Sequence, residues 1–363
     1  RIKYKKFKYL WIGYNMAYAA ISKPSLHFNT KLYTGNGGTN AITGVGFQPD
    51  FVWMKNRDST DWHYLNDAVR GVQETIFSNG TNAEQTKSNG LTAFGTDGFT
   101  VGSEGDVNGN SENFVSWNWK AGTGQGSSNT DGSINTTYTS VNTTAGFSIS
   151  KFTGTGANAT VGHGLGAVPK TIITKNLSSA NNWAMYHTST GNTKSFQLDG
   201  NGSPATSAAY WNNTTPTSSV FTVSTGNDVN KSGDSIIAYC FAEKKGYSKF
   251  GSYTGNASAN GPFIYTGFSP AFIIIRSTSG NHWMMRDNKR PGFNANFNKL
   301  FPDRNVAENT DTSNQMDFLS NGFKLRASNT EQNGSSTSYI YMAFAAEPLV
   351  ANSGSNGVPA TAK

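Results

Sequence analysis

Three tryptophans are the side chains in this sequence whose type and spacing best fit ligand binding. Trp62, Trp183 and Trp283 lie 13, 14 and 13 residues after prolines that begin similar apolar segments, and His63 follows the first of them. An indole ring on the rim of a β-sheet protein can stack on the apolar face of a sugar, beside Asn and Asp side chains that bind hydroxyl groups. The same rings could instead pack in the cores of three similar modules. The sequence leaves both interpretations open.

An oxygen-rich loop is the second candidate site. Asp106, Asn108, Asn110 and Glu112 carry side-chain oxygens at alternate positions, and such oxygens are the ligands that Ca²⁺ prefers. The loop lacks the glycine spacing of an EF-hand, and a polar hairpin turn is the alternative in a chain this rich in Asn. Calcium is the one cofactor that the sequence suggests.

Catalytic motifs are missing from the sequence. It has no Gly-x-Ser-x-Gly nucleophile elbow, no His-Glu-x-x-His and no phosphate loop that ends in Gly-Lys-Ser/Thr. No carboxylate pair with the spacing of sandwich-fold glycanases is visible either. The five histidines are scattered, and the single cysteine, Cys240, lies in an apolar segment where we expect a buried, inert thiol. We therefore expect a protein that is not an enzyme.

The positive charge of the chain is confined to its first residues. Five of the seven net charges come from the basic residues at positions 1–8, and the chain from Asn15 onward has 24 basic and 22 acidic residues. This near-neutral body does not favour a nucleic-acid partner. The composition is rich in Gly, Asn, Ser, Thr and aromatic residues, which favours short strands joined by many turns.

Four landmarks recur three times along the chain. An aromatic-Thr-Gly triplet precedes a proline that begins an apolar segment; a basic residue follows the proline by six positions, and an aromatic strand ends 70, 72 or 74 residues after it. Repetition in register indicates three diverged copies of one module of about 100 residues. The proline, the basic residue and the last aromatic residue of each copy are Pro49, Lys55 and Trp119; Pro169, Lys175 and Phe241; and Pro270, Arg276 and Phe344.

The residue pattern around these landmarks predicts strands. Proline fits the first position of a strand because it cannot donate to the ladder, and the apolar run after it predicts burial on both faces. Residues 114–119 alternate between apolar and polar side chains, which predicts a half-exposed strand, and Leu65–Phe77 is the best helix candidate. We expect an all-β fold of tandem antiparallel β-sandwich or jelly-roll modules, lectin-like, in three diverged repeats.

Six segments follow from these boundaries. The basic and then apolar start loosely imitates a secretory signal and is too short to span a bilayer; we favour Met16 as the natural start instead. The expected segments are residues 1–24, a leader or upstream extension outside the fold; 25–122, β module 1; 123–146, a linker able to supply an edge strand; 147–246, β module 2; 247–348, β module 3; and 349–363, a flexible tail.

Five stretches, at residues 16–18, 28–37, 46–53, 246–256 and 358–363, carry a resemblance to known proteins. They resemble a family from marine bacteriophages and environmental viral sequences, and the resemblance covers the chain from Met16 onward. That family carries a domain of unknown function and is usually assigned to phage structural or tail-fibre-like proteins. The resemblance implies no site residues.

The resemblance and the β modules together lead to one expectation of function. We expect a non-enzymatic phage virion protein, a tail or fibre component that contacts host-surface glycans and is extracellular after release. The alternatives are a capsid-decoration or spacer protein without a ligand, and a polysaccharide depolymerase. The expected partners are other virion proteins and a host-surface glycan or envelope component, and a homo-oligomer fits a fibre role. Nucleic acid and a membrane span are not expected.

Overall fold

The computed structural model describes residues 19–353 and 356–359, and it confirms the predicted all-β fold. The strands pair in antiparallel sheets, and every α-helix in the described part has four residues. None of these helices is long and apolar enough to cross a membrane. Short strands with frequent turns are what the Gly, Asn, Ser and Thr content favours.

Module 1 is a two-layer sandwich that follows the 3-10 turn Pro24–Leu26. Its larger sheet has the order β1-β9-β3-β4-β5-β6, its smaller sheet has the order β2-β8-β7, and helix α1 (Gly105–Asn108) lies between β8 and β9 in the chain. The strands are β1 (Phe28–Thr34), β2 (Asn40–Thr43), β3 (Phe51–Asn56), β4 (Tyr64–Asp67), β5 (Glu74–Phe77), β6 (Gln85–Thr86), β7 (Leu91–Gly95), β8 (Gly98–Val101) and β9 (Asn113–Trp119).

Module 2 has a similar larger sheet, but its other strands form two separate pairs. Its larger sheet has the order β10-β11-β18-β13-β14, and β12-β17 and β15-β16 form two-stranded sheets. The elements are β10 (Tyr138–Asn142), β11 (Phe147–Thr153), β12 (Ala159–Gly162), β13 (Thr171–Asn176), β14 (Ala184–His187), β15 (Lys194–Ser195), β16 (Ala205–Thr206), α2 (Ala208–Trp211), β17 (Val220–Val223), α3 (Asn227–Asn230) and β18 (Ser235–Phe241).

Module 3 pairs the sheet β19-β25-β21-β22 with the sheet β20-β24-β23. A final hairpin, β26-β27, follows it. The elements are β19 (Ser248–Thr254), β20 (Phe263–Tyr265), β21 (Phe268–Ser277), β22 (Met284–Asp287), the 3-10 turn Thr312–Asn314, β23 (Met316–Leu319), β24 (Gly322–Leu325), α4 (Thr330–Asn333), β25 (Ser338–Pro348), β26 (Val350–Ser353) and β27 (Asn356–Pro359).

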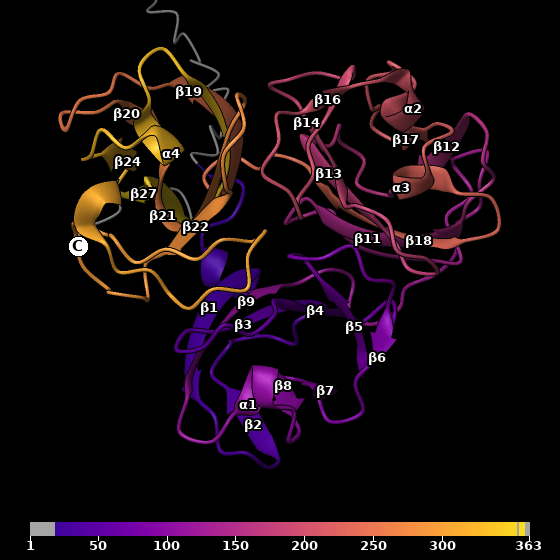
Figure 1. The fold of residues 1–363 in the computed structure, drawn as a ribbon, viewed down its shortest axis with the longest axis horizontal. Coiled ribbons are helices and arrows are strands. Elements are labelled where there is room, and N and C mark those ends of the chain that lie inside the picture. The colour runs from indigo at the N-terminus through magenta and orange to yellow at the C-terminus, as the bar shows by residue number, and fades with distance from the viewer. Residues whose placement is uncertain (1–18, 354–355, 360–363) are drawn as a thin grey trace, which may run out of the picture.

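One strand order occurs in all three larger sheets. It is β1-β9-β3-β4 in module 1, β11-β18-β13-β14 in module 2 and β19-β25-β21-β22 in module 3. The smaller sheets share the pairs β2-β8, β12-β17 and β20-β24. Figure 1 shows the modules around a common centre, with module 1 below, module 2 at upper right and module 3 at upper left. Three diverged repeats is our interpretation of this recurrence.

A buried asparagine closes the helical turn of each module. The side-chain oxygens of Asn108, Asn230 and Asn333 accept hydrogen bonds from backbone N–H groups at 3.0, 2.8 and 2.8 Å. Their amide groups donate to backbone carbonyls six residues upstream, at 2.8, 3.0 and 2.8 Å. All three residues are buried at the end of α1, α3 or α4. Each amide therefore ties its helical turn to the loop after β1, β11 or β19.

The central strands of the larger sheets are buried on both faces, which corrects the expected half-exposed strand. On β9, Trp117 lies in a core shared by the three modules, and Ser116 and Asn118 are also buried. Each module has a second core between its own two sheets, and the one in module 1 includes Val52 and Met54. A polar side chain at alternate positions therefore marks the face inside the module here, and not a face in water.

The modules contact one another in a closed ring. Trp183 of module 2 donates its indole N–H to the Phe77 carbonyl of module 1 at 2.8 Å, and Trp283 of module 3 donates to the Gln197 carbonyl of module 2 at 2.9 Å. Arg57 of module 1 forms an ion pair with Glu308 of module 3 at 2.8 Å. Each pair of modules thus shares at least one buried or half-buried polar contact.

Several expected boundaries and elements differ from the structure. Leu65–Phe77 contains β4, a turn and β5 instead of a helix, because its apolar residues face two different cores. Ala19 and Ile21 are 2% and 4% exposed, so the fold begins before residue 25. Segment 123–146 supplies the expected edge strand as β10, and it also pairs Ile134 with Val161, so it is no free linker. The expected tail holds the β26-β27 hairpin, and residues 1–18, 354–355 and 360–363 lie outside the described part.

Candidate functional site

Two of the three candidate tryptophans are core residues. Trp183 and Trp283 are 0% and 1% exposed, and both indole N–H groups are used between modules. The centroids of the Trp283 and Phe196 rings lie 5.8 Å apart in an edge-on arrangement, and the guanidinium of Arg276 lies 5.3 Å from the centroid of the Trp283 ring. Neither ring is free to stack on a ligand.

The strand register shows that His63, and not Trp62, matches these two tryptophans. Phe51 pairs with Asp67, Thr171 with His187 and Phe272 with Asp287, so His63 precedes its paired position by four residues, as Trp183 and Trp283 do. His63 is buried and accepts a hydrogen bond from the Trp53 indole at 2.9 Å. Burial, and then the charge of Lys55, hold the pKa of His63 well below its usual value. His63 is therefore a neutral packing residue.

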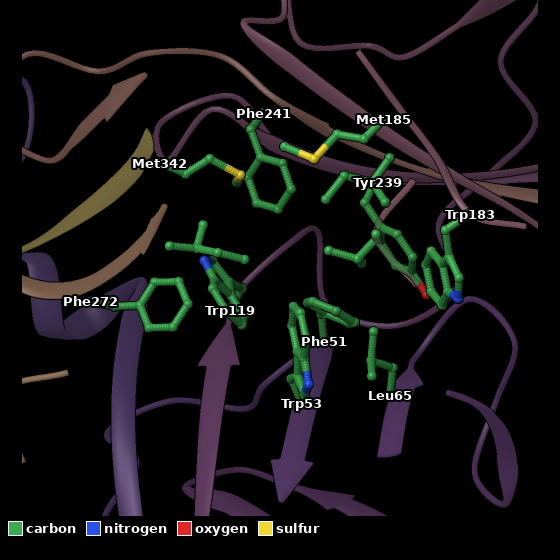
Figure 2. Close-up of a pocket in the computed structure, with 13 residues that line it drawn as sticks. Phe51, Trp53, Leu65, Trp119, Trp183, Met185, Tyr239, Phe241, Phe272 and Met342 are labelled. Carbon is green, nitrogen blue, oxygen red and sulfur yellow. The ribbon is translucent and has the colours of Figure 1, made fainter. Parts of the chain in front are cut away.

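The centre of the molecule contains an apolar cavity of about 20 Å³. Figure 2 shows side chains of all three modules around it, including Phe51 and Trp119 of module 1, Tyr239 and Phe241 of module 2 and Met342 of module 3. This volume is close to that of one water molecule, but a water needs polar partners and the lining offers none. The cavity is a packing feature and no site for a polar ligand.

Trp62 lies in a surface pocket of module 1 instead. The pocket has a volume of about 150 Å³. The Trp62 and Tyr64 rings each meet the Phe77 ring edge-on, with centroids 5.1 Å apart in both pairs and planes at 71° and 84°. Gly80 makes room for the indole, because a Cβ at this position would lie 2.5 Å from the Trp62 ring. The remaining lining residues are Asn82, Gln85, Lys87 and Asp106.

The pocket combines aromatic faces with hydrogen-bonding groups. The Asn82 and Gln85 amides can donate and accept, Lys87 can donate, and the Asp106 carboxylate can accept. Trp62 is only partly buried, unlike Trp183 and Trp283. An aromatic wall with several convergent polar groups in a concave surface is the usual form of a small-ligand site. This is the candidate site that the structure supports.

A family model for a domain of unknown function, DUF7483, matches residues 23–348. The chain belongs to the DUF7483 family. No curated protein and no solved structure matches it. The expected domain of unknown function is therefore confirmed, and its DUF7483 region includes all three modules and the Trp62 pocket.

The four expected calcium ligands of the DUF7483 chain serve separate purposes. Asn108 is the buried asparagine that closes the α1 turn. Glu112 accepts hydrogen bonds from Asn56 at 2.8 Å and Ser59 at 2.8 Å. Asp106 lines the Trp62 pocket, and Asn110 is exposed in the turn after α1. Among the described residues, no group of three or more His, Cys, Asp or Glu side chains is placed to hold a metal ion.

Several carboxylates lie in or near the Trp62 pocket. Burial, then the nearby charge of Asp61, raise the pKa of Asp106, and Glu104 adds to the effect. Burial lowers the pKa of Lys55 to about 8, against the opposing charges of Asp61, Asp106 and Glu112. None of the ion pairs among the described residues includes Asp61, Glu104 or Asp106. The Asp106 carboxylate therefore feels the charges of two other carboxylates, opposed by the amines of Lys87 and Lys55.

Sequence reasoning found Trp62 and Asp106 but not the other residues of the pocket. Trp62 and Tyr64 are two positions apart at the start of a strand, which is the spacing that places side chains on one face. That signal was available, but Phe77, Asn82, Gln85 and Lys87 come from a different hairpin that was assigned in part to a helix. Cys240, by contrast, is buried as expected, and burial raises the pKa of its thiol.

Proposed function

We propose that this DUF7483 protein is a non-enzymatic phage virion protein, a tail or fibre component that binds host-surface glycans through the Trp62 pocket. The observation that carries the proposal is the partly exposed Trp62 ring beside Asn82, Gln85, Lys87 and Asp106. An indole face binds the C–H face of a pyranose, and the polar groups orient its hydroxyls. The phage assignment rests on the sequence resemblance.

Binding to host surfaces tests this proposal directly. The full chain should bind a subset of a glycan array or an isolated host envelope, and added protein should reduce phage adsorption. Trp62→Ala should abolish binding. Tyr265→Ala is the matched control, because Tyr265 is an aromatic residue 57% exposed on module 3, far from the pocket in the chain. If the chain binds neither glycan nor envelope and leaves adsorption unchanged, the receptor role is wrong.

The position of the protein in the virion separates the alternatives. Labelled electron microscopy should place it on the tail, whereas a position on the head would favour capsid decoration or a spacer role. Release of reducing ends from host polysaccharide would favour the depolymerase. The carboxylates beside the pocket belong to an aromatic binding surface, and we propose no catalytic step for them.

A further inference from the structure

We propose that the Trp62 pocket selects its ligand by a positively charged alkylammonium group. This inference rests in part on the proposed function, since it defines the class of glycan that the same pocket would take: one that carries an amino sugar or a choline substituent. The pocket offers three aromatic rings and a surplus of carboxylates, and a neutral sugar would use only the first of these.

Three aromatic rings line the pocket, and we call Trp62, Tyr64 and Phe77 the aromatic box. Phe77 on β5 contacts both other rings, and each of them meets it nearly at a right angle at a centroid distance of 5.1 Å. Aromatic faces attract alkylammonium ions within about 6 Å. The volume of about 150 Å³ suits a group the size of trimethylammonium or one aminomethine end of a sugar.

The Tyr64 hydroxyl joins the aromatic rings to the nearby carboxylates. Tyr64 is fully buried and lines the pocket, and its hydroxyl interacts with the side chains of Asp106 and Glu104. Burial raises the pKa of this hydroxyl, and the carboxylates of Asp106 and Glu104 raise it further.

The local charge favours a cation over an anion. Asp61, Glu104 and Asp106 act on one another or on Tyr64, and none of them is in an ion pair among the described residues. Lys87 and Lys55 offset part of this charge, and the buried Lys55 amine also donates to the carbonyls of Asn56 at 2.6 Å and Ser59 at 2.9 Å. A bound ammonium group would relieve the repulsion between the carboxylates.

The same position is different in the other two modules. By the strand register, Trp62, Tyr64 and Phe77 correspond to Asn182, Ala184 and Gln197 in module 2, and to His282, Met284 and Phe301 in module 3. In module 3, His282 already pairs with Asp303 at 2.6 Å. The aromatic box belongs to module 1 only, so one molecule should bind one ammonium group.

The test is a titration of the full chain with three probes at constant ionic strength, followed by calorimetry and tryptophan fluorescence. The probes are tetramethylammonium chloride, a glucosamine tetramer and its fully N-acetylated counterpart. The glucosamine tetramer should bind at least about tenfold more tightly than the neutral tetramer, and tetramethylammonium should compete with it. Sodium chloride at equal ionic strength should not compete.

Variants assign the effect to the pocket. Asp106→Asn should weaken binding of the glucosamine tetramer by about tenfold, and Lys87→Gln should strengthen it by a few-fold, because each changes one charge beside the rings. Glu347→Gln, which removes an exposed charge on β25, is the matched control and should have no effect. Trp62→Ala should abolish binding of all three probes.

The outcomes separate the two proposals. Equal affinity for the amino and the N-acetylated tetramers would leave the glycan function standing and overturn selection by charge. Binding of tetramethylammonium without either tetramer would support the ammonium site, with a choline headgroup as its source, and overturn the glycan role. No binding of any probe would overturn the ammonium site, and the glycan array would then decide the proposed function alone.

Discussion

Modules 1 and 2 have the same strands around the pocket position but fill it differently. Module 1 has a pocket lined by Trp62, Tyr64 and Phe77, whereas module 2 has Asn182 just before β14, Ala184 on β14 and an added helix, α2. Tyr210 of α2 acts on Asp228, the counterpart of Asp106, and the Asn182 N–H donates to the same carboxylate at 3.1 Å. Residues that recur between modules build the fold, and residues that depart from the repeat in module 1 line the candidate pocket.

The largest expected difference is between alanine variants of Trp183 in module 2 and Trp62 in module 1. Trp183→Ala should lower the free energy of unfolding by about 3–5 kcal/mol, because it removes a buried ring and the hydrogen bond to Phe77. Trp62→Ala should cost about 1 kcal/mol or less, since its ring is partly exposed. Urea unfolding of both variants measures the difference. Similar losses would contradict the assignment of Trp62 to a binding surface.

A lower pH should destabilise the protein through a residue of module 2 that module 1 lacks. Position 67 of module 1 is an Asp, and the equivalent position in module 2 is His187, whose pKa burial lowers to about 4 while a weaker hydrogen bond to Tyr341 opposes this. As the pH falls from about 6.5 to 4, the unfolded chain gains a proton that the folded chain refuses, so stability should fall by about 3 kcal/mol.

His187→Gln should remove this part of the acid sensitivity. The comparison must be made between the wild type and the variant, because the buried His63 and His163 act in the same direction and Asp199, with a pKa raised by burial to about 6, acts in the opposite one. Chemical denaturation at pH 7 and pH 4.5 supplies the four values. An unchanged pH dependence in the variant would show that His187 titrates normally.

The three buried asparagines that close the helical turns should contribute similarly to the stability of the protein, unlike the residues at the pocket position. Asn108→Ala, Asn230→Ala and Asn333→Ala should each destabilise the protein by about 1–3 kcal/mol, because each leaves buried backbone groups without partners. Thermal unfolding measures the three losses. A loss at Asn108 that calcium specifically reverses would restore the metal interpretation of that loop.

The smallest expected effect is at Tyr210. Tyr210→Ala should empty the position in module 2 that corresponds to the Trp62 pocket. The change in affinity for an ammonium probe should still be less than about twofold, because Asn182, Ala184 and Gln197 stand there in place of the three aromatic residues. Calorimetry in the Trp62→Ala background isolates any new site. Binding there would show that acidic surroundings alone are sufficient.

The sequence predicted the positions of the strands better than it predicted which residues are equivalent between the modules. Proline-led apolar segments and glycine-rich turns located the central strands, since these signals are local. The equal offsets of Trp62 and Trp283 from their prolines were misleading, because the register places Phe272 and Asp287 one residue closer together than Phe51 and Asp67. Only strand pairing reveals that shift.

The shared core could not be predicted for a different reason. Trp117, Phe241 and Phe344 read as residues of separate modules, and each has a face that an isolated sandwich would expose. Their burial depends on three sheets that meet, and no spacing within one module specifies that contact. The pocket depends in the same way on a strand, a hairpin and a helical turn that are distant in sequence.

The closed ring of modules has a consequence for how the protein withstands dilution. Three separate chains in this arrangement would dissociate as their concentration falls, since their association is a mass-action equilibrium. Here the peptide links keep the three partners at a high effective concentration, whatever the number of molecules present. Arg57 therefore meets Glu308, and Trp183 meets Phe77, even in a single isolated particle.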